Sequence, residues 1–365
     1  WYVTETHKKK ENDGHCDPHW QPNRLNDIGS NVIGVTIQHC ALGIRIDRSR
    51  SGYERIVVQN AHFLANNRAI SSVSGSLLVS NCSFVGSHHF EEASAIFFGS
   101  NNRDLLIENC DFKYARLDLA RASVGSSKLL NLDPLLLSSD NSIDDTEGIL
   151  DNPGSAIIIA AVWAKNITIS KSRFVNNTCS TCRVEVALLS LASETVNLSE
   201  CFFGNDTIAS KHPLTLVHIE PHRLSQRHTV NINRCIFSHL LSTAGSGVKW
   251  ISCSNSQSFV ISYSVFEHST TSGAALECRF CGFGGQTRIE NSLFHHNTIT
   301  GGIIASGFYL TDSIIEKNTV YNVPLLGRTN STNSLSDTMI SNVTLQLNQA
   351  IGTPLCAIAT GWTFD

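Results

Sequence analysis

The sequence has little charge of either sign, few prolines, a single methionine and no long apolar run. Charged residues make up 16% of the chain and the net charge is −4, so no basic excess could neutralise a phosphate backbone, and we expect no nucleic-acid partner. No segment reaches the roughly 18 apolar residues of a membrane-spanning helix, so we expect no membrane span. The methionine is Met339 rather than the first residue, which indicates a processed or excised part of a larger chain.

Apolar residues and cysteines are what the sequence has in quantity. Hydrophobic residues form 41% of the chain, enough for a large core, and with the low charge this argues against disorder. The 12 cysteines would fit an oxidising compartment. Several of them recur at one position of a repeat, however, where a small buried residue needs no disulfide.

Eleven segments align on one aromatic or aliphatic residue, which we call the anchor. Successive anchors lie 21 to 34 residues apart, the span of one solenoid repeat, except for a step of 62 that carries an insertion at 116–154. The anchors are Leu42, Phe63, Phe84, Phe112, Phe174, Phe203, Phe237, Phe266, Phe294, Ile315 and Leu345.

Each repeat reads as three short strands separated by turns. Apolar residues five and seven places before the anchor alternate as in a strand with one buried face, for example Val58 and Ile56. Turns three places before and three places after the anchor favour Asn. In the first turn Asn tolerates the left-handed conformation, and its amide can bond to the backbone and to the Asn of the next coil. The first turn has Asn60, Asn81, Asn109, Asn291 and Asn342, and the second has Asn66, Asn177, Asn297, Asn318 and Asn348. The third strand follows variable loops, at 94–99, 155–160, 186–192, 214–220, 247–252, 273–278 and 301–306.

The position two places before the anchor is small in every repeat. Its cysteines could form a metal or redox cluster, but we favour a stack of small buried side chains, because free cysteine is among the most buried residue types. The column is Cys40, Ala61, Cys82, Cys110, Ser172, Cys201, Cys235, Ser264, Ser292, Ser313 and Val343.

These columns predict an all-β fold, a single right-handed parallel β-helix (solenoid) of about eleven coils. Stacking coils about 4.8 Å apart buries continuous columns of like residues that one coil could not bury alone. We expect an N-terminal tail or cap at 1–30, the β-helix at 31–350 with its loop insertion at 116–154, and a C-terminal cap or edge at 351–365. The N-terminal stretch could bind a metal, but a cap over the first strand edge is favoured.

The FxxN pieces Phe63–Asn66, Phe174–Asn177 and Phe294–Asn297, with the openings GGII (301–304) and SGAAL (272–276), resemble the repeats of polymorphic outer-membrane proteins, which are bacterial autotransported adhesins. The wider pattern is similar to the right-handed parallel β-helix proteins of the pectin-lyase-like superfamily. The resemblance implies the fold and leaves function open, because this fold hosts lyases, hydrolases, adhesins and tail-spikes.

An enzyme of this superfamily would need acidic side chains clustered on neighbouring coils. The resemblance implies acidic Ca²⁺ ligands with an Arg or Lys in a lyase, or clustered Asp with a His in a hydrolase. RID (45–47) and RIE (288–290) are only fragments of such sets, and no carboxylate pair recurs at outward positions as glycoside hydrolysis requires. We therefore favour a non-catalytic protein, with a polysaccharide lyase or glycoside hydrolase as the alternative.

The insertion at 116–154 ends in an acidic stretch. Its oxygen-rich side chains could bind Ca²⁺, although their spacing is not that of an EF-hand loop, and a solvated loop is the simpler interpretation. The candidate ligands are Asp140, Asp144, Asp145 and Glu147.

Histidines occupy the position two places after the anchor in three successive repeats. His239, His268 and His296 form this column and Lys317 continues it, with Glu267, His295 and Glu316 one place earlier. On stacked coils they would be neighbours about 5 Å apart. The column predicts either a metal or acidic-glycan site, or turn residues that simply stack at a corner.

Two CxxC pairs, Cys179 with Cys182 and Cys278 with Cys281, could form local disulfides, or Cys253 could bridge to the next coil. Plain buried thiols and, less favoured, a zinc site are the alternatives. Together these observations predict an extracellular or cell-surface scaffold, similar to an adhesin, that binds a glycan or a surface protein through its side face and loops.

Overall fold

The computed structural model describes residues 31–40, 42–46, 55–66, 68–73, 75–87, 95–100, 103–115, 158–182, 186–210, 215–221, 228–243, 248–254, 256–279, 286–303, 309–321, 325–326, 338–352 and 362–364. Within these ranges every regular element is a β-strand, and none is a helix that could cross a membrane. The strands form three sheets, and neighbouring strands run parallel.

The first sheet has 11 short strands, one from each coil, and ten of them carry a predicted anchor at the centre. The strands are β2 (Thr36–Gln38), β5 (His62–Leu64), β8 (Ser83–Val85), β11 (Asp111–Lys113), β13 (Arg173–Val175), β16 (Phe202–Gly204), β20 (Ile236–Ser238), β24 (Val265–Glu267), β28 (Leu293–His295), β31 (Ile314–Glu316) and β34 (Thr344–Gln346).

The largest sheet has 18 strands and contains two ladders. The ladder that precedes the first turn comprises β1 (Asn31–Ile33), β4 (Arg55–Gln59), β7 (Ser76–Ser80), β10 (Asp104–Glu108), the second halves of β12 (Ile159–Ser170) and β15 (Val186–Ser199), β19 (His228–Asn233), β23 (Ser256–Ser262), β27 (Gln286–Glu290), β30 (Tyr309–Thr311), β33 (Thr338–Ser341) and β36 (Trp362–Phe364). The other ladder contains the predicted third strand, in β9 (Ile96–Phe98), the first halves of β12 and β15, β18 (Thr215–Glu220), β22 (Lys249–Ser254) and β26 (Leu276–Arg279). It also contains β3 (Leu42–Ile46) and β6 (Arg68–Ser72), which the sequence patterns did not assign to it. Of the strand predicted at 301–306, the described residues 301–303 form no strand. The ladders join because β12 and β15 run through the corner between them.

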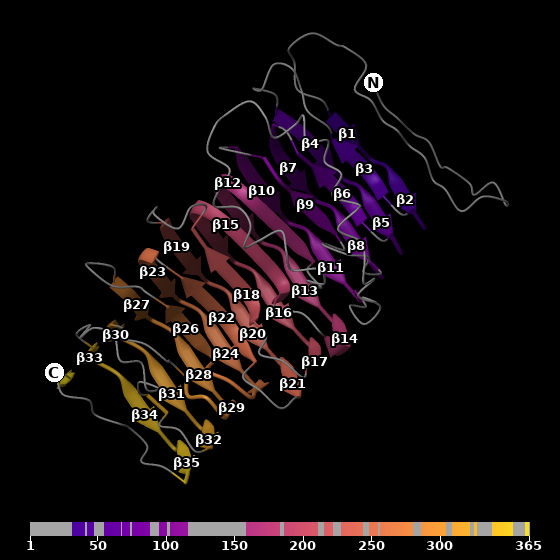
Figure 1. Cartoon of the computed structure of the whole chain (residues 1–365). Coiled ribbons are helices and arrows are strands. Elements are labelled where there is room, and N and C mark those ends of the chain that lie inside the picture. Colours follow the sequence, from indigo (N-terminus) through magenta and orange to yellow (C-terminus); the bar gives the residue numbers. More distant parts are fainter. Residues whose placement is uncertain are drawn as a thin grey trace, which may run out of the picture.

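A sheet of seven short strands follows the second turn, and the sequence patterns did not predict it. Its strands are only two to five residues long, so each points few residues inward, such as Ile208, Ile299 and Val320. Figure 1 shows its strands stacked beside the 11-stranded sheet along the same axis. They are β14 (Thr178–Cys182), β17 (Thr207–Ser210), β21 (Leu241–Thr243), β25 (Thr270–Thr271), β29 (Thr298–Ile299), β32 (Thr319–Tyr321) and β35 (Gln349–Ile351).

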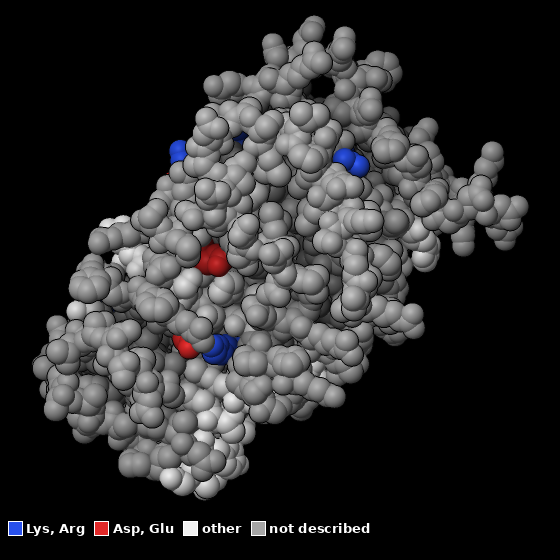
Figure 2. Space-filling view, viewed as in Figure 1, with Lys and Arg blue, Asp and Glu red and all other residues white. Residues whose placement is uncertain are grey.

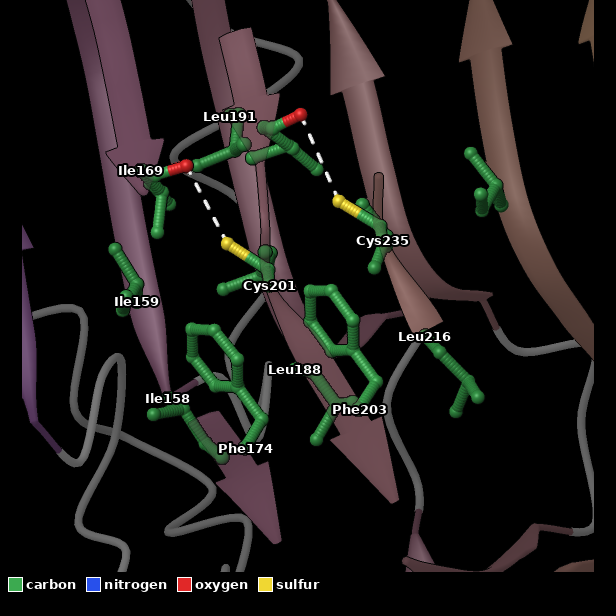
Figure 3. Close-up of a cluster of buried hydrophobic side chains, with 14 of the residues drawn as sticks. Ile158, Ile159, Ile169, Phe174, Leu188, Leu191, Cys201, Phe203, Leu216 and Cys235 are labelled. Atoms are coloured by element: carbon green, nitrogen blue, oxygen red, sulfur yellow. Dashed lines mark hydrogen bonds between the residues drawn. The ribbon is translucent and has the colours of Figure 1, made fainter. Parts of the chain in front are cut away.

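The anchors from Phe63 to Ile315 stack in one buried column, which confirms the predicted parallel β-helix. Register pairs Phe63 with Phe84, and so on along the axis. Neighbouring rings lie 4.6 to 4.8 Å apart with planes within 5° of parallel. Phe112 and Phe174 are adjacent although 62 residues separate them, so the insertion leaves the column uninterrupted. Figure 3 shows Phe174 and Phe203 within the apolar interior.

The first coil is the one place where the predicted anchor is wrong. Ile37, not Leu42, lies opposite Phe63, and Leu42 lies opposite Arg68 in the next ladder. Backbone conformation decides this register, because His39, two places after Ile37, has the left-handed φ of 56° that recurs after every anchor strand. Cys40 therefore stands in the column of the second turn, where its N–H donates to Asn66 Oδ1 at 2.9 Å.

The column of small residues is an internal hydrogen-bond ladder rather than a metal or redox cluster. Cys201 Sγ donates to the carbonyl oxygen of Ile169 at 3.3 Å, as Figure 3 shows. Serines in the same column accept from the coil before, for example the Cys235 N–H to Ser264 Oγ at 3.2 Å. Its cysteines from Cys82 to Cys235 are buried thiols, as the favoured interpretation predicted.

The second turn is held by a buried ladder of amides. Asn318 is fully buried, its Nδ2 donates to the carbonyl oxygen of Phe294 at 2.8 Å, and its Oδ1 accepts from the Asn297 N–H at 3.0 Å. Each such side chain satisfies backbone groups that the turn leaves without a strand partner. The asparagines of the first turn adopt the left-handed conformation as predicted, for example Asn109 with φ of 51°.

The ends of the β-helix bear on the predicted domain limits. The tail at 1–30 and the insertion at 116–154 lie outside the described residues, so both stay predictions. At the other end, β36 pairs with β33 as one more parallel strand beyond the last anchor.

Candidate functional site

Eight polar side chains gather where the 11-stranded sheet turns into the seven-stranded sheet. We call this cluster the histidine corner: Ser238, His239, Glu267, His268, His295, His296, Glu316 and Lys317. It spans four successive coils, at the ends of β20, β24, β28 and β31.

Backbone geometry explains why these side chains line up. The residue two places after each anchor has φ of 47° to 53° at His239, His268, His296 and Lys317. Identical turns on stacked coils aim their side chains in the same direction. The residue one place after the anchor ends the strand and is less exposed, so Glu267 and His295 lie beside the column rather than in it.

The three column histidines are exposed and stack ring on ring. His239 and His268 have centroids 5.1 Å apart with planes at 24°, and His268 and His296 have centroids 4.9 Å apart at 17°. His295 meets His268 and His296 edge-on, at 5.4 Å and 5.1 Å. The structure thus brings the predicted residues together, and it also shows the corner stacking that the simpler interpretation expected.

Glu267 is the centre of the hydrogen bonds in the corner. Its Oε1 accepts from the Ser238 hydroxyl at 2.9 Å, and its Oε2 lies 2.8 Å from His295 Nε2. Burial favours a raised pKa for Glu267, but the hydrogen bonds from Ser238 and His295 and the charge of the imidazoles outweigh it and lower the pKa below its usual value. Glu267 is therefore a carboxylate at neutral pH.

The ring nitrogens of His295 and His296 face each other. Their Nδ1 atoms are 3.0 Å apart, so one must donate and the other accept. Because His295 Nε2 faces the Glu267 carboxylate, that nitrogen carries the proton, and His295 Nδ1 is the acceptor. Loss of solvation and the charges of His268 and Lys317 lower the pKa of His296, so its imidazole is neutral at pH 7.

Lys317 ends the column, and its Nζ lies 3.7 Å from Glu316 Oε1. With Glu267 and Glu316 as carboxylates, the corner has no excess of fixed positive charge. This argues against the acidic-glycan variant of the sequence hypothesis.

Elsewhere, the described Lys, Arg, Asp and Glu side chains on the face in Figure 2 are few and scattered, and form no continuous patch.

Among the described residues, one group of three His, Cys, Asp or Glu side chains has its possible ligand atoms close together, and it lies in this corner. His268, His295 and His296 each offer one ligand atom, and these atoms all lie within 4.8 Å of one another. Sequence reasoning named His295 only as a neighbour of the column and missed Ser238. The position one place after the anchor would have found Ser238, since Glu267 and His295 occupy it in the next coils.

The other predicted sites lie mostly outside the described part of the chain. The acidic set of the insertion, from Asp140 to Glu147, falls there, so the Ca²⁺ loop stays a prediction.

Among the cysteines of the predicted disulfides, Cys179 is disulfide-bonded. The side chains of Cys182, Cys278 and Cys281 are outside the described part, and the local pairings stay predictions. The cross-coil bridge from Cys253 is wrong, because Cys253 is a buried thiol whose Sγ lies 3.4 Å from His228 Nε2.

Comparison with known proteins adds little to this picture. No family model matches the chain, and no curated protein matches it. Among solved structures, the chain is similar to a mannuronic-acid-specific polysaccharide lyase of family 6 from the human gut microbiota, with 13% identity, a TM-score of 0.32, and coverage of 93% of this chain and 86% of the lyase. A TM-score this low supports neither a shared fold nor a shared function, so the fold assignment rests on the strand pairings themselves.

Proposed function

We propose that this protein is an extracellular or cell-surface β-helix scaffold that binds a glycan along the histidine corner without cleaving it. The observation that carries the proposal is the alignment of exposed imidazoles on three successive coils, flanked by carboxylates and an ammonium.

The chemistry of the corner fits sugar hydroxyls better than a polyanion. Imidazole nitrogens and carboxylate oxygens accept hydrogen bonds, Lys317 and neutral imidazoles donate them, and the exposed ring edges give apolar contact. The repeat places these groups at steps of about 5 Å along a straight line. An extended polymer could therefore contact several coils at once, which multiplies weak contacts.

The disulfide at Cys179 supports the proposed location, because disulfides persist in oxidising compartments. The buried thiols of the interior column do not oppose it, since burial keeps them from oxidants in the solvent.

A polysaccharide panel tests the proposal. The chain is incubated with neutral, carboxylated and sulfated polymers, and both binding and the appearance of new reducing ends or unsaturated products are measured. We expect saturable binding without turnover, and a loss of affinity of about tenfold or more in the double variant His239→Ala/Lys317→Ala. The matched control is Arg234→Ala, an exposed cation in the same coil as His239 but at the other turn.

Turnover of any polymer would overturn the non-catalytic proposal in favour of a lyase or hydrolase. Absence of binding to every polymer, or equal binding by the corner variant and the control, would overturn the assignment of the corner.

A further inference from the structure

We propose that His268, His295 and His296 form a binding site for one late first-row transition-metal ion, with Zn²⁺ as the reference ion. The proposal goes beyond glycan binding and does not depend on it, because it concerns three imidazoles and one carboxylate whose geometry stands by itself.

The possible donor atoms of the three histidines are already close to the positions that one metal ion requires. In a tetrahedral site with Zn–N bonds of about 2.0–2.1 Å, ligand nitrogens lie about 3.3 Å apart. His295 and His296 already hold their Nδ1 atoms 3.0 Å apart, and the His268 ligand atom lies within 4.8 Å of both. Binding of the ion replaces the hydrogen bond between the two Nδ1 atoms, and the neutral His296 ring then carries its proton on Nε2 instead of Nδ1. The His268 ring is exposed, so a side-chain rotation that moves its ligand nitrogen by about an ångström completes the set of three ligands without moving the backbone.

Glu267 also determines which ring nitrogen of His295 carries the proton. Because Glu267 Oε2 accepts from His295 Nε2, the lone pair of His295 lies on Nδ1, the atom that faces the other ligands. Histidine ligands of metals characteristically donate their other ring N–H to a carboxylate, which fixes the tautomer and orients the ring. Glu267 is itself held by the Ser238 hydroxyl at 2.9 Å, so the supporting shell exists before a metal arrives.

The charges around the three imidazoles and their exposure to solvent also favour a bound cation. A cation at the three imidazoles would lie beside the Glu267 carboxylate, while the ammonium of Lys317 is drawn toward Glu316. His268 and His296 face solvent, so a fourth coordination position is open to water or to an oxygen of a ligand.

The donor type selects the class of metal. Three imidazoles suit Zn²⁺, Cu²⁺, Ni²⁺ or Co²⁺, whereas Ca²⁺ and Mg²⁺ require oxygen ligands that these side chains lack. Among the suitable ions we expect Cu²⁺ to bind more tightly than Zn²⁺ or Ni²⁺, following the general affinity order for nitrogen sites.

The test is calorimetric titration of the full chain, carrying no histidine tag, with Zn²⁺ alone. The double variant His268→Ala/His296→Ala removes two exposed ligands at turns, where folding should not suffer. The wild type should bind one Zn²⁺ more than this variant, a difference that cancels any metal held elsewhere in the chain. Glu267→Gln should keep that ion but lower its affinity about 10- to 100-fold.

The matched control is His239→Ala, which removes a stacked, exposed imidazole of the same column one coil away. It should bind Zn²⁺ as the wild type does. Equal stoichiometry in the wild type and the double variant would overturn the proposal. Loss of the extra ion in His239→Ala would equally overturn it, because the ion would then belong to the whole column rather than to the three named ligands. Circular dichroism of every variant confirms that the fold is kept.

Discussion

The phenylalanine column inside the β-helix and the histidine column on its corner are produced by the same repeat, yet stacking has different consequences in the two places. The phenylalanine rings are almost completely buried and 4.6 to 4.8 Å apart, so each removes a large apolar surface from water. The histidine rings are 4.9 to 5.1 Å apart but exposed, so their stacking adds little stability. A surface column therefore needs a further feature to indicate function, and here that feature is the Glu267–His295 pair, which has no counterpart in the buried columns of the described residues.

The largest expected effect is the removal of one ring from the buried column. Phe174→Ala should lower the free energy of unfolding by about 3–5 kcal/mol, because the flanking rings of Phe112 and Phe203 cannot close the cavity. His268→Ala, in the exposed column, should change it by about 0.5 kcal/mol or less. Chemical denaturation followed by circular dichroism measures both, and similar losses in the two variants would remove the distinction between the columns.

The next effect concerns a carboxyl group in a buried column. Asp206 stands in the ladder of the second turn, where Asn177 N–H donates to its Oδ1 at 2.7 Å. Its Oδ2 has no hydrogen-bond partner in the described part of the chain. Burial raises the pKa of Asp206 to about 8, from an ordinary value of 3.8.

The sign of the resulting pH dependence follows from proton binding. Between about pH 4 and pH 8 the folded state holds a proton that the unfolded state has lost. Stability should therefore be fully present below pH 4 and fall by on the order of 1 kcal/mol per pH unit up to about pH 8. Asp206→Asn, which supplies the side chain found at Asn177 and Asn297, should abolish this contribution and raise the unfolding midpoint at pH 8 more than at pH 5. An equal shift at both pH values would show that Asp206 is ionised in the folded state.

A smaller effect tests the column of thiols and hydroxyls. Cys201→Ser should change the unfolding free energy by less than about 1.5 kcal/mol, since serine fills the same column at Ser172 and Ser264. There the hydroxyl donates to the carbonyl two residues earlier, as the Cys201 thiol does to Ser199 at 3.4 Å. Cys201→Leu should cost about 1–3 kcal/mol through overpacking. If the serine variant lost as much stability as the leucine variant, the thiol would have a role that simple packing does not give it.

The smallest effect belongs to the corner itself. Glu267→Gln keeps the shape of the side chain but weakens its hydrogen bond with His295, and at this half-exposed place we expect a loss of stability of about 1 kcal/mol or less. Thermal unfolding measures it. A loss of several kcal/mol would mean that the corner is part of the structural framework rather than a surface placed on it.

Most of the fold could be predicted from the sequence because one strong residue, the anchor phenylalanine, recurs in eight of the coils, from Phe63 to Phe294. The anchor of the first coil was predicted wrongly because Ile37 is aliphatic and Leu42 is an equally good apolar candidate five residues later. The conformation of His39 decides between them, and that is not visible in the residue types. The unusual position of Asp206, by contrast, could have been found from the sequence, since this residue stands three places after Phe203, where asparagine is the most frequent residue.

The candidate site could be predicted only in outline. Spacing from the anchors placed His239, His268 and His296 in one column, because equivalent positions on stacked coils must be neighbours. It could not show that His295 turns its Nδ1 toward His296 and its Nε2 toward Glu267, because those contacts depend on side-chain rotamers and tautomers. The acidic insertion was equally prominent in the sequence, and nothing in residue spacing ranked it against the corner.

The stacking of coils in register is tested most directly by a double-mutant cycle on Phe112 and Phe174, which are neighbours in space and 62 residues apart in the chain. The single variants Phe112→Leu and Phe174→Leu and the double variant give a coupling energy, with Phe112 and Phe266 as a control pair from distant coils. We predict a coupling of about 0.5–1.5 kcal/mol for the neighbouring pair and none beyond error for the control. Equal coupling in the two pairs, or none in either, would contradict the stacked column on which the whole account rests.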